Sequence, residues 1–189
     1  MYFPAILRVF TLLSLLLLGL LTVAAASPAR QKPHKPRTFR LRADQRAPAP
    51  VNKFGFLDYR LGWYASPAQN YHAYIEPYGN RTTPGQEGWG KCHDASNPAA
   101  ILWLRPTHGT PMYFVFSGDP NSDTIPALTL WDSWAISRGP DGREFLNYGQ
   151  SAGWMACKSG NDWRLYWGPQ VGPPTCTNVF ALEVVWDYN

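Results

Sequence analysis

The sequence predicts an all-β fold, which we expect to be a single antiparallel β-sandwich of the jelly-roll-like kind, with one disulfide and little or no helix. Aromatic residues make up 15% of the chain, and 18 prolines and 16 glycines divide it into short segments. No segment shows the apolar period of a long amphipathic helix. Near the C-terminus, Cys157 and Cys176 bracket an aromatic segment that has strand composition.

The chain divides into three predicted parts. Residues 1–26 have the pattern of a signal peptide, with an apolar run from Val9 to Val23 and small residues at Ala24–Ala26. We expect the mature protein to begin at or near Ser27, and the alternative is an uncleaved signal anchor. Residues 27–36 form a basic, proline-rich linker, and residues 37–189 form the β-sandwich domain. The sequence has no second apolar stretch of spanning length, so we expect no stable membrane insertion after cleavage.

The positive charge is concentrated before the body of the domain. Residues 27–50 contain seven basic residues and one acid, whereas residues 51–189 contain nine basic and twelve acidic residues. A basic arm can contact nucleic acid, acidic glycans or membrane surfaces. For a secreted chain we expect a solvated leader or a processed pro-segment, and no nucleic-acid partner.

Alternating apolar residues and turn residues predict the strands in order. Residues 38–42 alternate, with their arginines facing water, and residues 57–63 place apolar side chains at period two. Residues 101–105 and 112–116 flank a turn and predict a hairpin. Further strands are expected at 71–76, 134–137, 145–148, 154–157, 163–167 and 179–186.

Three cysteines allow three single pairings, each with one thiol left over. We expect Cys157 to pair with Cys176, because both border neighbouring aromatic strands. Cys92 lies in a polar, glycine-containing region and is expected to be a buried, inert thiol; a free thiol or a site of intermolecular pairing is the alternative.

The C-terminal segments resemble a family of small secreted proteins of filamentous fungi. The resemblance is carried by residues 145–148, 153–157, 165–167, 174–176 and 179–185, and less specifically by residues 39–42. The same C-terminal part is similar to fungal cell-wall proteins linked to conidiation, in which two cysteines also flank a Leu-Tyr strand. The resemblance implies secretion, a compact β-sandwich and no known catalytic residues; Cys92 departs from its two-cysteine pattern.

Two motifs favour an enzyme only weakly. Residues 149–153 match the G-x-S-x-G pattern around Ser151, but a strand is predicted after it, and all four histidines precede it. Carboxylates of the type used by glycosidases stand at Asp119, Asp123, Asp132, Asp141 and Glu144, mostly in turn-like segments. We therefore expect no catalytic residues, and a small secreted hydrolase remains an alternative.

Metal and cofactor sites are not expected either. Cys92, His93 and Asp94 are adjacent, but neighbouring residues on a strand point to opposite faces and rarely share one metal. A metal site would need His72 or His108 to join them.

The expected role is that of a secreted, non-catalytic protein of the cell surface or extracellular space. Its partner would be a cell-wall polysaccharide, or a host or other extracellular protein. A carbohydrate-binding module is the alternative, with aromatic residues stacking on sugar rings from positions beside loops: Trp63, Trp89, Trp131 and Trp134. Asn80 begins an N-glycosylation sequon between Gly79 and Pro84.

Overall fold

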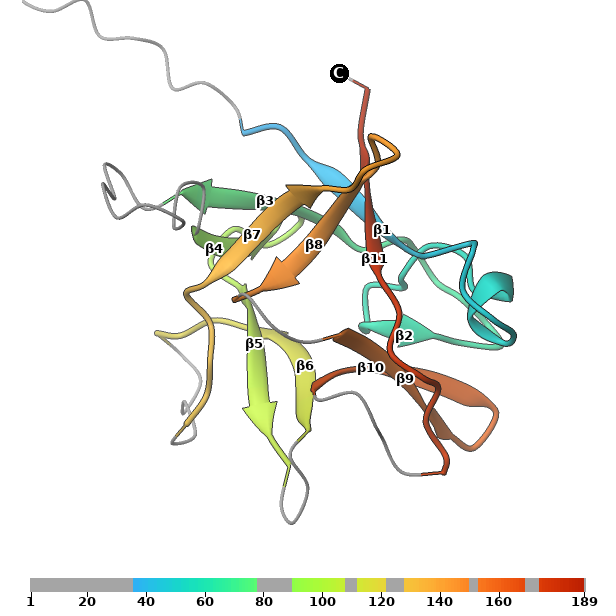
Figure 1. Ribbon diagram of the computed structural model, residues 1–189. Coiled ribbons are helices and arrows are strands. Elements are labelled where there is room, and N and C mark those ends of the chain that lie inside the picture. Colours follow the sequence, from blue (N-terminus) through green and yellow to red (C-terminus); the bar gives the residue numbers. More distant parts are fainter. Residues whose placement is uncertain are drawn as a thin grey trace, which may run out of the picture. The chain divides into compact units, whose positions relative to one another are not determined.

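The computed structural model describes residues 36–77, 90–107, 112–121, 128–149, 153–168 and 174–188. Within them the chain is all-β, with eleven strands and one turn of 3₁₀ helix, η1 at Val51–Lys53 (Figure 1). This confirms the predicted class and the scarcity of helix in the described part. The strands are β1 Phe39–Ala43, β2 Gly62–Trp63, β3 His72–Pro77, β4 Gly90–Asp94, β5 Ile101–Pro106, β6 Tyr113–Gly118, β7 Trp134–Arg138, β8 Glu144–Tyr148, β9 Gly153–Ser159, β10 Asp162–Gly168 and β11 Leu182–Trp186.

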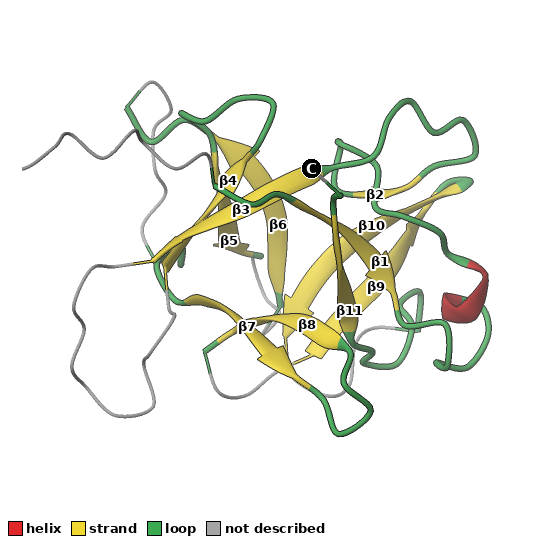
Figure 2. Ribbon diagram, turned by 90° about the horizontal axis from the view of Figure 1, so that it is seen from above, coloured by secondary structure: helices red, strands yellow, loops and turns green. Residues whose placement is uncertain are grey.

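The strands form one antiparallel sheet that closes on itself (Figure 2). The order β4-β3-β1-β11-β8-β7 returns to β4 through the pairing of Gly90 with Trp134, which gives a closed six-stranded barrel. From β4 the sheet continues outward through β5, β6 and β10, and β10 pairs with β2 and β9. The closed ring differs from the expected jelly-roll-like sandwich. Inward and outward residues alternate in both architectures, so the alternation alone does not distinguish them.

Glycine turns connect two of the observed hairpins, β7–β8 and β9–β10. The β7–β8 hairpin turns at Gly142, with φ +80°, and the β9–β10 hairpin turns at Gly160, with φ +64°. These left-handed conformations favour glycine because a Cβ atom is strained there. The β5–β6 hairpin also forms, with Arg105 opposite Phe114.

The strand predicted over residues 57–63 is wrong. The chain turns after Asp58, where Leu61 has φ +58° and donates its N–H to the Asp58 carbonyl. The Asp58 carboxylate accepts hydrogen bonds from the Arg60 N–H and the Arg60 guanidinium. Such local side-chain bonds compete with strand pairing, so only Gly62 and Trp63 join the sheet, and Tyr59 is 47% exposed.

The core is built from inward-facing residues of the barrel strands. In β1, Phe39, Leu41 and Ala43 are buried, whereas Arg40 and Arg42 face outward and form ion pairs with Asp187 and Glu183. Further inside, the rings of Trp134 and Trp154 stack with centroids 5.9 Å apart. Their indole N–H groups donate to the carbonyls of Leu102 and Leu146, so these large residues are buried without unpaired donors.

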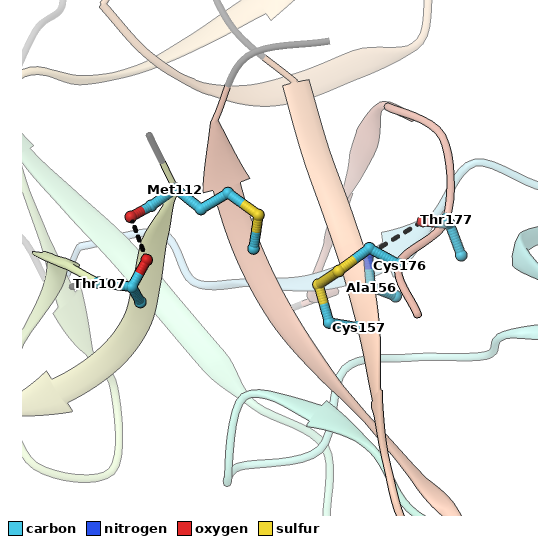
Figure 3. Close-up of a disulfide and its surroundings, with 6 residues drawn as sticks. All are labelled: Thr107, Met112, Ala156, Cys157, Cys176 and Thr177. Carbon is cyan, nitrogen blue, oxygen red and sulfur yellow. Dashed lines mark hydrogen bonds between the residues drawn. A yellow bond between two sulfur atoms is a disulfide. The ribbon is translucent and has the colours of Figure 1, made fainter. Parts of the chain in front are cut away.

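The predicted Cys157–Cys176 disulfide is present (Figure 3). The two residues face each other in an antiparallel bridge, and their Cα atoms are 3.9 Å apart. Hydrogen bonds flank the bridge on both sides, from the Lys158 N–H to the Thr175 carbonyl and from the Thr177 N–H to the Ala156 carbonyl. The disulfide therefore fastens the segment before β11 to β9.

Cys92 is unpaired and fully buried in β4, as expected, although the strand itself was not predicted. Burial raises the pKa of its thiol, which keeps the reactive thiolate scarce. We expect Cys92 in the native, unreduced protein to resist iodoacetamide at pH 8 for hours and to react within minutes in denaturant. Mass spectrometry of alkylated peptides measures this, and rapid native labelling of Cys92 would contradict its burial.

The apolar N-terminal run lies outside the described residues, so the expected signal peptide stays a prediction. Among the helices of the described part, none has the length and apolar character to cross a membrane.

Candidate functional site

A cleft of about 410 Å³ opens beside η1, β2 and the start of β10. We call it the aromatic cleft, because five of its lining residues are aromatic: Phe54, Phe56, Trp63, Tyr64 and Trp163. Lys53, Asp58, Asn70 and Asn161 add polar groups to its lining. Small-molecule sites have this character, being mostly apolar with a few polar groups that orient the ligand.

Strand pairing places the two tryptophans of the cleft opposite each other. Trp63 on β2 is the register partner of Trp163 on β10. Gly62 makes this close approach possible, because a Cβ atom there would lie 2.4 Å from the Trp163 carbonyl oxygen. The two-residue strand β2 thus fixes the inner wall of the aromatic cleft.

The wall of the aromatic cleft is held by ring packing. Phe54 stacks on Trp63 with centroids 4.7 Å apart and lies 5.4 Å from Trp163. The Trp63 indole N–H donates to the Gly55 carbonyl at 3.0 Å. Trp63 is 8% exposed, so mainly the edge of its ring is accessible in the cleft. Phe56, Tyr64 and Trp163 are half-buried and expose more ring surface to a ligand.

An ion pair fixes one side of the aromatic cleft. Burial raises the pKa of the Asp58 carboxyl, but hydrogen bonds from Arg60 and the Ala68 N–H outweigh it and hold that pKa below its ordinary value. The Arg60 guanidinium also lies 3.7 Å from the Tyr64 ring centroid. Asp58 is therefore a charged structural anchor, whereas the amides of Asn70 and Asn161 are exposed and available to a ligand.

The four tryptophans proposed for ligand stacking have different surroundings. Trp63 lines the aromatic cleft. Trp134 is 0% exposed in the core, so it cannot stack on a ligand although it lies beside a loop. Trp131 is half-buried, with Lys91 Nζ 5.0 Å from its ring centroid. Trp89 and the sequon residue Asn80 lie outside the described residues.

Sequence reasoning missed most of the aromatic cleft. The period-two spacing of Trp163, Leu165 and Trp167 indicates a shared face, but it does not show which end of the strand is open. Phe54 and Phe56 precede a turn whose fold depends on the carboxylate of Asp58. The cleft is completed by Trp163 on β10, which packs against Phe54 but is distant from it in sequence.

The adjacent residues Cys92 and His93 do not share a site. Cys92 points into the core, whereas the His93 ring stacks on Tyr74, with centroids 4.9 Å apart, and its Nε2 lies 3.0 Å from a Glu76 oxygen. In the described ranges, no group of three or more His, Cys, Asp or Glu side chains is arranged to hold a metal ion. Ser151 and His108 lie outside those ranges.

The candidate carboxylates that the structure describes are engaged in local contacts. Hydrogen bonds from Arg143 hold the pKa of Asp141 below its ordinary value, and Arg46 adds a second ion pair. The Trp186 indole N–H, together with Arg138, does the same for Glu144. Asp132 accepts a hydrogen bond from the Tyr148 hydroxyl, and Asp119 caps a turn through the Asn121 N–H. Asp123 lies outside the described residues.

Comparison of the chain with protein-family models, curated proteins and solved structures finds no match.

Proposed function

We propose that this chain is a secreted, non-catalytic protein of the cell surface or extracellular space that binds carbohydrate in the aromatic cleft. The observation that carries the proposal is the meeting of five aromatic residues with exposed amides in one cleft. The N-terminal signal pattern and the disulfide support an oxidising, extracellular destination. A wall polysaccharide is the partner that fits this location.

The chemistry of the aromatic cleft suits a neutral sugar. The C–H faces of a pyranose ring are apolar and stack on aromatic rings, and its hydroxyl groups need donors and acceptors at the edge. Half-buried Trp163 and Tyr64 supply ring surface, and the exposed Asn70 and Asn161 amides supply both donors and acceptors. Because the rings are fixed by packing, a ligand meets a site that needs little ordering.

Replacing Trp163 with leucine is expected to weaken binding of a wall glucan or chitin oligosaccharide about tenfold, since loss of one stacking ring costs about 1.4 kcal/mol. Asn70→Ala should weaken it several-fold without lowering stability, because Asn70 is exposed. Isothermal titration and pull-down on insoluble wall polysaccharide measure both effects. The matched control is Trp131→Leu, which removes a half-buried tryptophan that is not part of the cleft lining.

Equal binding by wild type and Trp163→Leu, with both proteins folded by circular dichroism, would contradict the proposal. Loss of binding in the Trp131 variant alone would place the site elsewhere. Release of reducing sugar from the polysaccharide by the wild type would show a hydrolase instead.

A further inference from the structure

Two arginines of the described domain differ from all the others. Seven arginines pair with a carboxylate or lie over an aromatic ring: Arg37 over Trp186, Arg40 with Asp187, Arg42 with Glu183, Arg46 with Asp141, Arg60 with Asp58, Arg138 with Glu144 and Arg143 with Asp44. Arg105 and Arg164 are exposed, and within the described residues neither makes an ion pair, a side-chain hydrogen bond or a ring contact. Both line one shallow cleft of about 330 Å³.

We call this second site the arginine cleft; its other lining residues are Pro106, Thr107, Phe114 and Tyr166. Three neighbouring strands build it. Phe114 on β6 is the register partner of both Arg105 on β5 and Tyr166 on β10. Arg164 lies two residues before Tyr166 and therefore on the same face of β10. Among the described residues that line the cleft, none is a carboxylate that could neutralise the two guanidinium groups.

The arginine cleft and the aromatic cleft use opposite faces of β10. Trp163 and Arg164 are adjacent in the strand, so their side chains point to opposite sides of the sheet. Trp163 lines the aromatic cleft and Arg164 the arginine cleft. Tyr64 of the aromatic cleft interacts electrostatically with Arg164, so Trp163, which faces away from Arg164, is the residue that separates the tests of the two sites. The inference drawn from the arginines does not rest on the function proposed above.

The floor of the arginine cleft is aromatic and supported from the side. The rings of Phe114 and Tyr166 lie 5.5 Å apart, and Phe116 continues the row at 6.5 Å from Phe114. Tyr166 packs against a small apolar cluster of Met112, Met155 and Cys157. Thr107 at the rim donates its hydroxyl to the Met112 carbonyl, as drawn in Figure 3. This support gives a ligand a fixed apolar surface beside two positive charges.

An anionic ligand would neutralise the positive charge of the arginine cleft. Two guanidinium groups that line one cleft repel each other, and each presents a planar fork that matches the two oxygens of a carboxylate or sulfate. The body of the protein carries nine basic and twelve acidic residues from position 51 onward, so a cleft lined by two unpaired arginines is a local feature. Flat aromatic rings between the charges favour a ring-shaped ligand with an apolar face.

We propose that the arginine cleft binds an acidic oligosaccharide, with Arg105 and Arg164 holding its carboxylate or sulfate groups and a sugar ring lying on Phe114 and Tyr166. The sources of this chemistry are uronic acids and sulfated sugars. Single-stranded nucleic acid also combines anionic groups with flat rings. Protein grooves that bind it, however, follow its phosphate backbone with many cationic side chains. The part of the arginine cleft that the structure describes has two cationic side chains in its lining.

The test is isothermal titration of the folded full chain with three probes: trigalacturonic acid, a sulfated disaccharide and a neutral trisaccharide of the same length. We expect one or both acidic probes to bind and the neutral one to bind at least tenfold more weakly. Arg105→Gln and Arg164→Gln should each raise Kd about tenfold or more, because each removes a charged hydrogen-bonding partner. The Arg105→Lys and Arg164→Lys variants should have Kd values between those of the wild type and the glutamine variants. Lysine keeps the positive charge but lacks the planar guanidinium fork.

Arg138→Gln is the matched control, because Arg138 is also exposed, at 71% of its side chain, but lies on β7. Binding in this variant should equal that of the wild type. Raising the salt from about 50 to about 200 mM should weaken wild-type binding more than binding by the glutamine variants.

Several outcomes would overturn the proposal. One is the absence of binding to either acidic probe at about 1 mM, a concentration at which a site with a Kd of about 1 mM would be half filled. Another is equal affinity of the Arg105→Gln/Arg164→Gln double variant and the wild type. Tighter binding of a single-stranded oligonucleotide than of either acidic sugar would assign the cleft to a different ligand class. Trp163→Leu should leave acidic binding unchanged, which separates this test from that of the aromatic cleft.

Discussion

Replacing Trp134 with alanine is expected to lower the free energy of unfolding by about 4 kcal/mol, within the range measured for deletion of large buried aromatics. Trp134 is fully buried, stacks on Trp154 and meets Tyr148 edge to face at 5.1 Å. Alanine would leave a cavity among these rings and an unpaired carbonyl at Leu102, which accepts the indole N–H at 3.1 Å. The backbone of Trp134 also closes the barrel by pairing with Gly90.

Urea unfolding followed by far-ultraviolet circular dichroism measures this loss. The chain has nine tryptophans, so fluorescence would mix signals from several of them. Trp131→Ala is the control: its half-buried ring should cost less than half as much. Surface or partly buried substitutions ordinarily change the free energy of unfolding by less than about 1 kcal/mol. A change that small for Trp134→Ala would contradict the tight packing of its ring. Trp134→Phe should recover part of the loss by refilling the cavity.

Local chemistry explains the parts of the fold that could be predicted. The hairpins around Gly142 and Gly160 combine turn residues with alternating apolar neighbours, and both signals lie within a few residues of each other. The pairing of Cys157 with Cys176 was predictable because both border neighbouring aromatic strands. Neither inference required knowledge of distant parts of the chain.

The closed barrel could not be predicted, because its closure depends on strand edges that are distant in sequence. β4 reads Gly-Lys-Cys-His-Asp, which is too polar and short to indicate a strand. It is a strand because β3 pairs along it, with Ile75 opposite Cys92, and because Trp134 pairs with its first residue. Tertiary pairing here overrides weak local propensity.

The candidate sites also divide into features that the local sequence predicts and features that depend on tertiary pairing. Trp63 was predicted and does line a cleft, but Trp134 is equally aromatic and lies in the core. Residue type does not reveal exposure when tryptophans form both core and surface. Arg105 and Arg164 meet only because β6 lies between β5 and β10, and no spacing in the sequence indicates that arrangement.

Removing the disulfide is expected to lower the free energy of unfolding by about 3 kcal/mol, because the bridge closes a loop with a sequence separation of 19. The double variant Cys157→Ala/Cys176→Ala should still fold. The hydrogen bonds from Lys158 and Thr177 that flank the bridge remain, as does the bond from the Ala156 N–H to the Thr177 hydroxyl at 3.0 Å. Urea unfolding of the double variant measures the loss.

Reduction of the wild type provides the matched comparison, because it breaks the same bond without changing the sequence. The reduced wild type and the oxidised double variant should unfold at similar urea concentrations, below that of the oxidised wild type, and the variant should not respond to reductant. Arg164 lies opposite Cys157 on the same face of the β9–β10 hairpin, so both proteins should also bind acidic probes more weakly. A loss of less than about 1 kcal/mol would show that strand pairing alone holds this segment, since the loop-closure contribution would then be nearly absent.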